Sequence, residues 1–169
     1  MQTPCGGLNL LVHLLEREQT VWLDRERVFQ FFQRPENLGL VTPPWLRFKI
    51  LSPLPIDIKR HSLIDYRIVI KGIPVRWRTL IEEYAPPYHF VDEQLCGPYA
   101  YWRHEHRFDS EAGATRMGDR VEYALPQWLP RTLEVQVHKR LVRPALEEIF
   151  DYRAAALSQY FMHTVEAHR

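Results

Sequence analysis

Two histidines that lie two positions apart, His104 and His106, and the later Asp119 have the clearest potential for chemistry. Histidine titrates near neutral pH, and a carboxylate beside an imidazole fixes its tautomer and stabilises its charged form. Such a pair could move a proton during a dehydration or a cyclisation, which makes these three residues the candidate catalytic set. The same groups could instead form a structural network or orient a ligand, because buried charges must be paired. The sequence leaves these three interpretations open.

Strand alternation indicates which side chains share an interior with the two histidines. Successive side chains of a strand point to opposite faces, and the histidine pair has the same parity as the large apolar residues Trp102 and Phe108. Asp119 has the parity of the apolar residues in the following strand. The same argument gives a set of candidate ligand-binding residues that face the interior: Tyr66, Trp77, Thr79, Asp92, Gln94, Trp102 and Tyr123.

Arg153 adds a cation to this interior. It lies four residues after Ile149 and four before Leu157, on the apolar stripe of a predicted helix. A guanidinium at that place either extends to solvent or points at an interior carboxylate. We therefore add Arg153 to the candidate ligand-binding residues, with Asp119 or Asp92 as its carboxylate partner.

The histidine pair also raises the question of a metal site, because both imidazoles could reach one ion from one strand face. The spacing of Gly97, the two histidines, Glu111 and Gly118 resembles the first metal-binding motif of cupins. No glycine follows Gly118, so the second cupin motif is missing, and Glu111 falls in a predicted turn. A metal could instead use the histidines with Asp119 or Asp92. We predict no metal and no other cofactor.

The elements that position these residues follow from hydrophobic periodicity. A strand from Val12 to Leu23 precedes a helix at Arg25–Gln33, a second short helix at Pro35–Leu38 and a loop at Thr42–Trp45. Short links then require antiparallel pairing of the strands that come next. These strands are Phe48–Leu51, Leu63–Lys71, Val75–Tyr84, Phe90–Cys96, Tyr99–Phe108 and Thr115–Leu125.

A helical stripe of apolar residues predicts one long helix from Glu134 to His163, kinked or split at Pro144. The order of elements predicts an α+β fold in which a curved antiparallel sheet of about six or seven strands grips the C-terminal helix. The length of 169 residues suits a single domain covering residues 1–169. Because such a sheet rarely closes, an internal cavity is expected between sheet and helix.

The composition limits the classes of binding partner that we expect. The formal net charge of +1 argues against a dedicated nucleic-acid binder, and two cysteines, Cys5 and Cys96, indicate reduced thiols and a cytoplasmic location. The apolar stretch Leu8–Leu15 is too short to span a membrane. His13 and His138 show no spacing that indicates a partner, so we expect them at the surface or in ordinary packing. A peripheral membrane contact stays open because of one basic stretch: Arg131, Lys139, Arg140 and Arg143.

Several short motifs follow the predicted elements. They are Pro35-Glu36-Asn37-Leu38, Thr42-Pro43-Pro44-Trp45, Gly72-Ile73-Pro74 with Trp77, Phe90-Val91-Asp92-Glu93-Gln94, Gly97-Pro98-Tyr99 with Trp102, His104, His106 and Phe108, and Thr115 to Pro126 with Asp119 and Tyr123. With the element order, they resemble the SRPBCC or START-like helix-grip superfamily, and within it the bacterial polyketide cyclase/dehydrase-like branch. This resemblance covers almost the whole chain and implies a cavity for hydrophobic or amphipathic molecules.

Three functional hypotheses follow. The leading one is a domain that binds a hydrophobic small molecule or a lipid. The second is a cyclase or dehydratase that uses a His–Asp pair inside the cavity. The third is a protein that contacts a partner or a membrane through its basic stretch and the loop around Trp45. The sequence does not identify protein partners.

Overall fold

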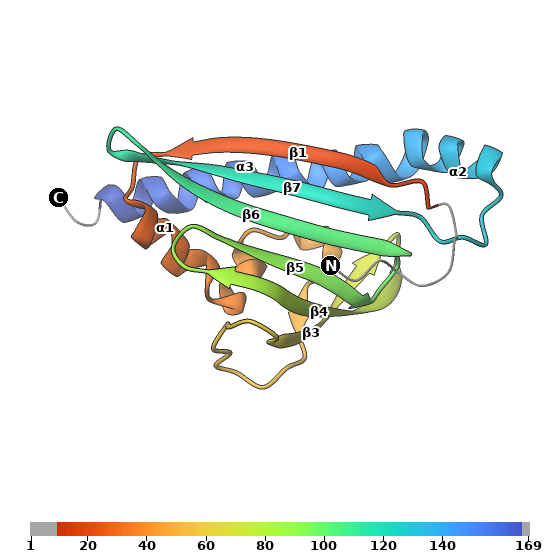
Figure 1. The fold of residues 1–169 in the computed structure, drawn as a ribbon, viewed down its shortest axis with the longest axis horizontal. Helices are drawn as coiled ribbons and strands as arrows, with labels where there is room; N and C mark the ends of the chain where they lie inside the picture. The colour runs from red at the N-terminus through yellow and green to blue at the C-terminus, as the bar shows by residue number, and fades with distance from the viewer. Residues whose placement is uncertain (1–9, 167–169) are drawn as a thin grey trace.

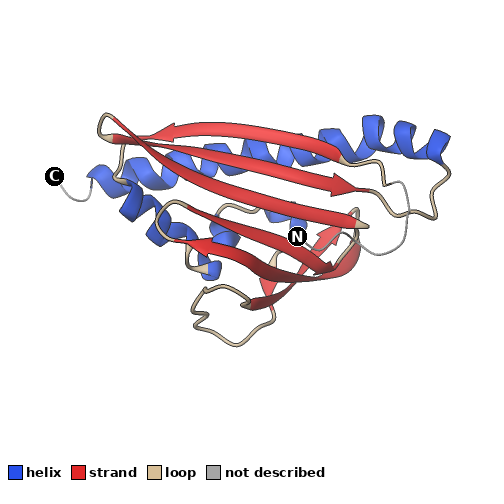
Figure 2. Cartoon of the chain, viewed as in Figure 1, coloured by secondary structure: helices blue, strands red, loops and turns tan. Residues whose placement is uncertain are grey.

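The computed structural model describes residues 10–166, which form a seven-stranded antiparallel sheet covered on one face by helices (Figures 1 and 2). The strand order is β1-β7-β6-β5-β4-β3-β2, so consecutive strands from β2 to β7 are neighbours and β1 pairs with β7. This arrangement confirms the predicted α+β architecture. The strands are β1 (His13–Val21), β2 (Lys49–Ile50), β3 (Leu63–Ile70), β4 (Ile73–Ala85), β5 (His89–Cys96), β6 (Tyr101–Glu111) and β7 (Ala114–Ala124).

Two-residue turns join β3 to β4 and β6 to β7. Lys71 and Gly72 both adopt positive φ, of 49° and 83°, and Ala112 and Gly113 adopt 40° and 85°. Positive φ at both turn residues matches the right-handed twist of the flanking strands and fixes their register. The turns therefore decide which side chains of adjacent strands lie opposite each other.

Short helices follow β1, as predicted. They are α1 (Arg25–Phe32) and the 3₁₀ helix η1 (Pro35–Leu40). A further 3₁₀ turn, η2 (Pro44–Leu46), lies where the sequence predicted only a loop. The difference has a local cause, because Pro44 has its φ fixed near the helical value and needs no hydrogen-bond acceptor at the first helical position.

The C-terminal helical segment is interrupted directly before Pro144. It consists of α2 (Arg131–Val137), the π-helical turn η3 (His138–Val142) and α3 (Arg143–Glu166). Proline lacks an N–H to donate and its ring clashes with the carbonyl four residues earlier, so the wider turn precedes it. The predicted break is thus confirmed, although the segment begins at Arg131 and not at Glu134. No helix within residues 10–166 combines the length and apolar character needed to cross a membrane.

The helix α3 lies along one face of the sheet, where Figure 1 shows it behind β1, β7 and β6. Its two halves pack in separate apolar clusters. Leu157 joins Phe108 and residues of α1, whereas Phe150 joins Trp102 and Trp77. Because Trp102 and Phe108 lie on the same strand, β6 carries both clusters, and the residues between them occupy the middle of the molecule.

Candidate functional site

A cavity of about 750 Å³ lies between the sheet and the helices. A ligand pocket for a small molecule measures roughly 300–1,000 Å³. The walls of the cavity in this protein come from strands β3 to β6, from η1, and from the α3 residues up to Arg153. Most lining side chains are aromatic or aliphatic, including Phe48, Ile68, Trp77, Trp102, Leu146 and Phe150.

Most of the candidate residues line this cavity. They are His104, His106, Tyr66, Trp77, Thr79, Asp92, Trp102 and Arg153. Asp119 is outside the lining and lies behind the two histidines, with its Oδ1 within 3.0 Å of both rings. Burial, and then the charge of Asp92, raise the pKa of Tyr66, so its hydroxyl stays protonated beside the cavity.

Two predicted ligand-binding residues, Gln94 and Tyr123, do not line the cavity. The side-chain amide of Gln94 donates to the Tyr99 carbonyl at 2.7 Å and accepts from the Tyr99 N–H at 3.2 Å. A Cβ at Gly97 would collide with this amide, so the glycine lets the turn after β5 close on it. The Tyr123 hydroxyl lies 2.9 Å from Nε2 of His138. Alternation placed both side chains on the inner face, but it does not specify how far the cavity extends along a strand.

Four side chains from three neighbouring strands form a closed network at the cavity wall. Asp92 on β5 lies directly opposite His104 on β6, and His106 lies directly opposite Asp119 on β7. The two histidines are two positions apart on β6, and each aspartate lies directly opposite one of them. All four side chains therefore project from the face of the sheet that α3 covers. Arg153 reaches the network from α3, with its Nη2 3.9 Å from Oδ1 of Asp119, one of the two carboxylate partners that the sequence left open.

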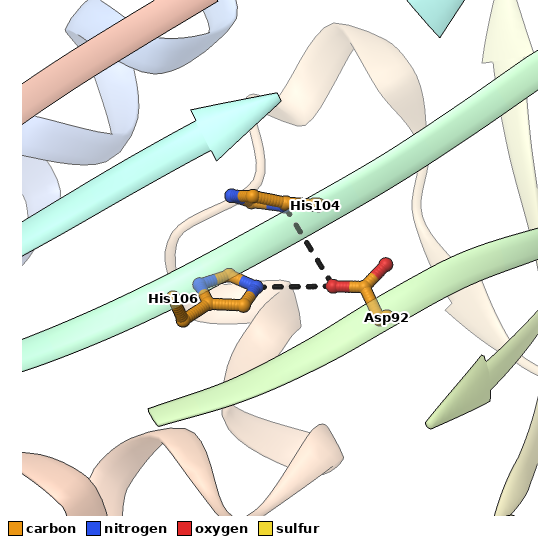
Figure 3. Close-up of side chains that lie close together, drawn as sticks. All are labelled: Asp92, His104 and His106. Carbon is orange, nitrogen blue, oxygen red and sulfur yellow. Dashed lines mark hydrogen bonds and ion pairs between the residues drawn. The ribbon is translucent and has the colours of Figure 1, made fainter. Parts of the chain in front are cut away.

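The distances define the hydrogen bonding. Oδ1 of Asp119 is 2.8 Å from Nε2 of His104 and 3.0 Å from Nδ1 of His106. Oδ2 of Asp92 is 3.0 Å from Nε2 of His106 but 3.7 Å from Nδ1 of His104 (Figure 3). Nε2 of His106 therefore donates to Asp92, and its Nδ1 lies within ion-pair distance of Asp119, whereas 3.7 Å is too long for a hydrogen bond and leaves Nδ1 of His104 with its lone pair.

Burial and the carboxylates divide the charge unequally between the two histidines. Burial lowers the pKa of His104, and the charge of His106 lowers it further. Burial would also lower the pKa of His106, but the carboxylates of Asp119 and Asp92 outweigh it and raise that pKa. His106 is therefore the member of the pair that takes up a proton first, and His104 the one that stays neutral longer.

The carboxylates are ionised. Burial would raise the pKa of Asp119, but Arg153 and the histidines hold it well below its usual range. The hydrogen bond with His106 likewise lowers the pKa of Asp92 against the effect of burial. Two carboxylates, one imidazolium and one guanidinium sum to zero, so the network is neutral as a whole.

The cupin-like spacing does not correspond to a site. Glu111 lies at the end of β6, where it forms an exposed ion pair with Arg116 at 3.0 Å, away from the histidines. The metal donors that come together are instead Asp92, His104 and His106, the alternative that the sequence left open.

The sequence missed a second histidine pair. His13 of β1 stacks on His138 of η3 with ring centroids 3.4 Å apart and an angle of 6° between the planes. The sequence predicted surface positions or ordinary packing for these residues; both are partly buried and pack on each other, because two segments from opposite ends of the chain meet here. Burial, followed by the neighbouring His13, lowers the pKa of His138 to about 4. Nothing in the local spacing of either residue could have revealed this contact.

Trp45 lines the cavity and also packs edge-on against Tyr152 of α3, with ring centroids 5.7 Å apart. It is about half exposed, so this side chain contributes to the cavity wall and also contacts solvent. In the basic stretch, Arg143 pairs with Glu147 at 2.9 Å. Contact with a partner or membrane through these segments stays a prediction, as does the cytoplasmic location.

Comparisons with known proteins agree with this architecture. A family model described as "Polyketide cyclase / dehydrase and lipid transport" matches residues 23–150. A search of curated protein sequences finds no match.

Several solved structures share the fold. The Zhui aromatase/cyclase from Streptomyces sp. R1128 has a TM-score of 0.73 and 13% identity, over 91% of this chain and 96% of that one. A norcoclaurine synthase point mutant from Thalictrum flavum, in complex with a transition-state analogue, has a TM-score of 0.66 and 11% identity, over 93% of this chain and 98% of that one. The protein TTHA0849 from Thermus thermophilus has a TM-score of 0.65 and 16% identity, over 90% of this chain and 99% of that one. At these identities the likeness shows the fold, and it confirms the predicted helix-grip architecture.

Proposed function

Because the chain belongs to the polyketide cyclase/dehydrase and lipid transport family, we propose that its cavity binds a small, largely apolar molecule with a polar, oxygen-bearing end. The observation that carries this proposal is the composition of the cavity wall. Aromatic and aliphatic side chains cover most of it, and the polar groups converge on one place, around His104, Asp92, Thr79 and Arg153. Burial of apolar surface would supply the affinity, and the polar cluster would set the orientation.

The charge balance of the network favours a neutral ligand. Its two carboxylates are matched by His106 and Arg153, so an ionic ligand would leave one charge unpaired in a buried site. A carbonyl or hydroxyl group needs only one or two hydrogen bonds, which the Tyr66 hydroxyl and Nδ1 of His104 can supply from the lining. The ligand proposed here is therefore an uncharged hydrophobic or amphipathic molecule, a class that includes neutral lipids.

Filling the cavity tests this proposal. Thr79→Phe places a ring into the space from β4, and we expect it to weaken binding of a hydrophobic fluorescent probe about tenfold or more, which is about 1.4 kcal/mol. Arg76→Phe is the matched control, because it adds the same ring to the exposed face of the same strand. Native mass spectrometry and solvent extraction of the purified chain identify any molecule that co-purifies. Equal probe binding by wild type and Thr79→Phe, with both folded, would contradict the proposal.

A second candidate function is a cyclase or dehydratase. The observation that favours it is the neutral His104, whose Nε2–H donates to Asp119 and whose Nδ1 keeps a lone pair at the cavity wall. That lone pair could remove a proton from a carbon next to a carbonyl, with Asp119 as the group that orients the ring.

Turnover separates this candidate from simple binding. With a β-hydroxycarbonyl compound as substrate, His104→Gln should lower kcat about 10²- to 10⁴-fold while probe affinity stays within a factor of two or three. His89→Gln is the control, because His89 pairs with Glu83 outside the cavity lining. Unchanged kcat in His104→Gln would exclude the base role of this residue.

A further inference from the structure

Asp92, His104 and His106 bring three donor atoms together at the cavity wall, where Figure 3 shows one nitrogen of each histidine beside the same oxygen of Asp92. One donor atom from each residue lies within 4.8 Å of the other two. Oδ2 of Asp92 is 3.0 Å from Nε2 of His106 and 3.7 Å from Nδ1 of His104. In a tetrahedral zinc site with bonds of about 2.0–2.2 Å, ligand atoms are about 3.3–3.6 Å apart. The two separations from Oδ2 of Asp92 bracket that range. We propose that these three residues bind one divalent first-row transition-metal ion, with zinc as the first candidate.

Asp119 supplies what a metal site requires around its ligands. A histidine that binds a metal through one nitrogen almost always donates the other ring N–H to a carboxylate or carbonyl, which fixes tautomer and orientation. Here Oδ1 of Asp119 accepts from Nε2 of His104 and lies 3.0 Å from Nδ1 of His106. The nitrogens left for an ion are then Nδ1 of His104 and Nε2 of His106, which lie 3.7 Å and 3.0 Å from Oδ2 of Asp92.

The position of the donors on the sheet gives the site a defined geometry. Asp92 and His104 are direct cross-strand partners, and His106 is the next residue on the same face of β6. Aromatic rings fix the histidines further, because Phe90 stacks on His106 at 4.1 Å and Phe150 contacts His104 edge-on at 5.6 Å. Such support holds ligands in place before the ion arrives.

Two imidazoles and one carboxylate are donors that zinc and iron(II) accept, and three protein ligands leave a coordination position open. All three residues line the cavity, so the open position faces the space for the bound molecule. An ion there would coordinate a carbonyl or hydroxyl oxygen of that molecule. It would also take the lone pair of His104 that the cyclase hypothesis assigns to proton transfer, so the two roles of this residue exclude each other.

This inference revises the prediction of no metal, which rested on the missing cupin motif. It does not depend on the proposed ligand, since metal binding is measured on the protein alone. The rival arrangement is a metal-free ion-pair cluster with His106 charged between two carboxylates.

Titration of the full chain with Co²⁺ tests the site, because cobalt replaces zinc and its visible absorption reports tetrahedral nitrogen and oxygen coordination. We expect one Co²⁺ per chain, displaced by Zn²⁺. Asp92→Asn and His104→Ala should lose the absorption, whereas Asp119→Asn should bind one ion about 10- to 100-fold more weakly. His89→Ala, on the same strand as Asp92 but outside the cluster, should bind as wild type.

The site would be disproved if folded wild type bound no more Co²⁺ than Asp92→Asn, with circular dichroism as the check of folding. Asp92→Asn keeps the size of the side chain, so it decides the matter even if His104→Ala fails to fold. The hydrophobic-probe titration is repeated on metal-free protein. Probe binding without metal binding would refute this site only, and metal binding without probe binding would refute only the proposed function.

Discussion

Two pairs of closely packed histidines lie within residues 10–166, and their environments favour different charge states. His104 and His106 pack with ring centroids 3.8 Å apart between carboxylates of β5 and β7. His13 and His138 pack at 3.4 Å, and the hydrogen-bonding partner of His138 is the hydroxyl of Tyr123. One member of the first pair is charged, whereas burial lowers the pKa of both members of the second.

Packing two imidazoles together therefore does not determine their protonation. The cross-strand partner does, because Asp119 lies opposite His106, whereas Tyr123 lies opposite His13. A carboxylate at that place offsets the cost of burying an imidazolium, and a phenol does not. The interior pair is therefore built to hold a charge or an ion, and the end pair to exclude one.

Removing a carboxylate from the interior pair should have the largest effect. Asp119→Ala leaves His106 and Arg153 without their shared partner, and we expect the metal-free protein to lose about 3–5 kcal/mol of unfolding free energy. Urea denaturation measures it. Asp65→Ala is the control, because its ion pair with Arg78 is partly exposed and should contribute about 1 kcal/mol or less. A similar small loss of unfolding free energy in both variants would show that the interior network contributes little to the stability of the fold.

Removing the phenol of the end pair should have a smaller effect. Tyr123→Phe deletes the hydroxyl that lies 2.9 Å from His138 and keeps the buried ring. We expect a loss of about 1 kcal/mol, the usual net contribution of one hydrogen bond. Tyr160→Phe, at a half-exposed ring of α3, provides the baseline for removing a hydroxyl. Equal losses in both variants would count against a stabilising bond to His138.

The pH dependence of the end pair should be the smallest effect. The folded-state pKa of His138 is about 4, below the value of 6.5 for an unperturbed histidine, so the unfolded chain binds the extra proton first. This contribution to stability is complete above pH 6.5 and is lost as the pH falls toward 4. Besides His13 and Tyr123, the charged groups facing the pair are Glu134 and Arg143.

His138→Gln removes this titration and keeps an acceptor for Tyr123. We expect the stability of wild type relative to the variant to fall by several tenths of a kcal/mol, and by at most about 1 kcal/mol, between pH 7 and pH 4.5 after solvent screening. Urea denaturation at the two pH values gives the difference. A constant difference would mean that His138 has the same pKa in the folded and unfolded chain.

Sequence patterns predicted the fold and the inner face well, because both depend on local periodicity. The alternation in β6 placed His104 and His106 beside Trp102 on the inner face, and the structure finds them there. What the sequence missed depends on contacts between different elements. Gln94 turns to the backbone of Tyr99 in the turn after β5 instead of the cavity, and His138 meets a residue near the other end of the chain. No spacing rule within one element records such partners.

The π-helical turn at His138–Val142 holds one more residue than an α-helical turn would. Each residue of an α-helix advances the side-chain direction by about 100°, so the extra residue sets the phase of α2 relative to α3. The extra residue of this turn therefore helps to set the direction in which His138 projects toward His13. A chain shortened by one residue within this turn would keep the helix but rotate α2, and with it the surface that the C-terminal segment shares with the start of β1.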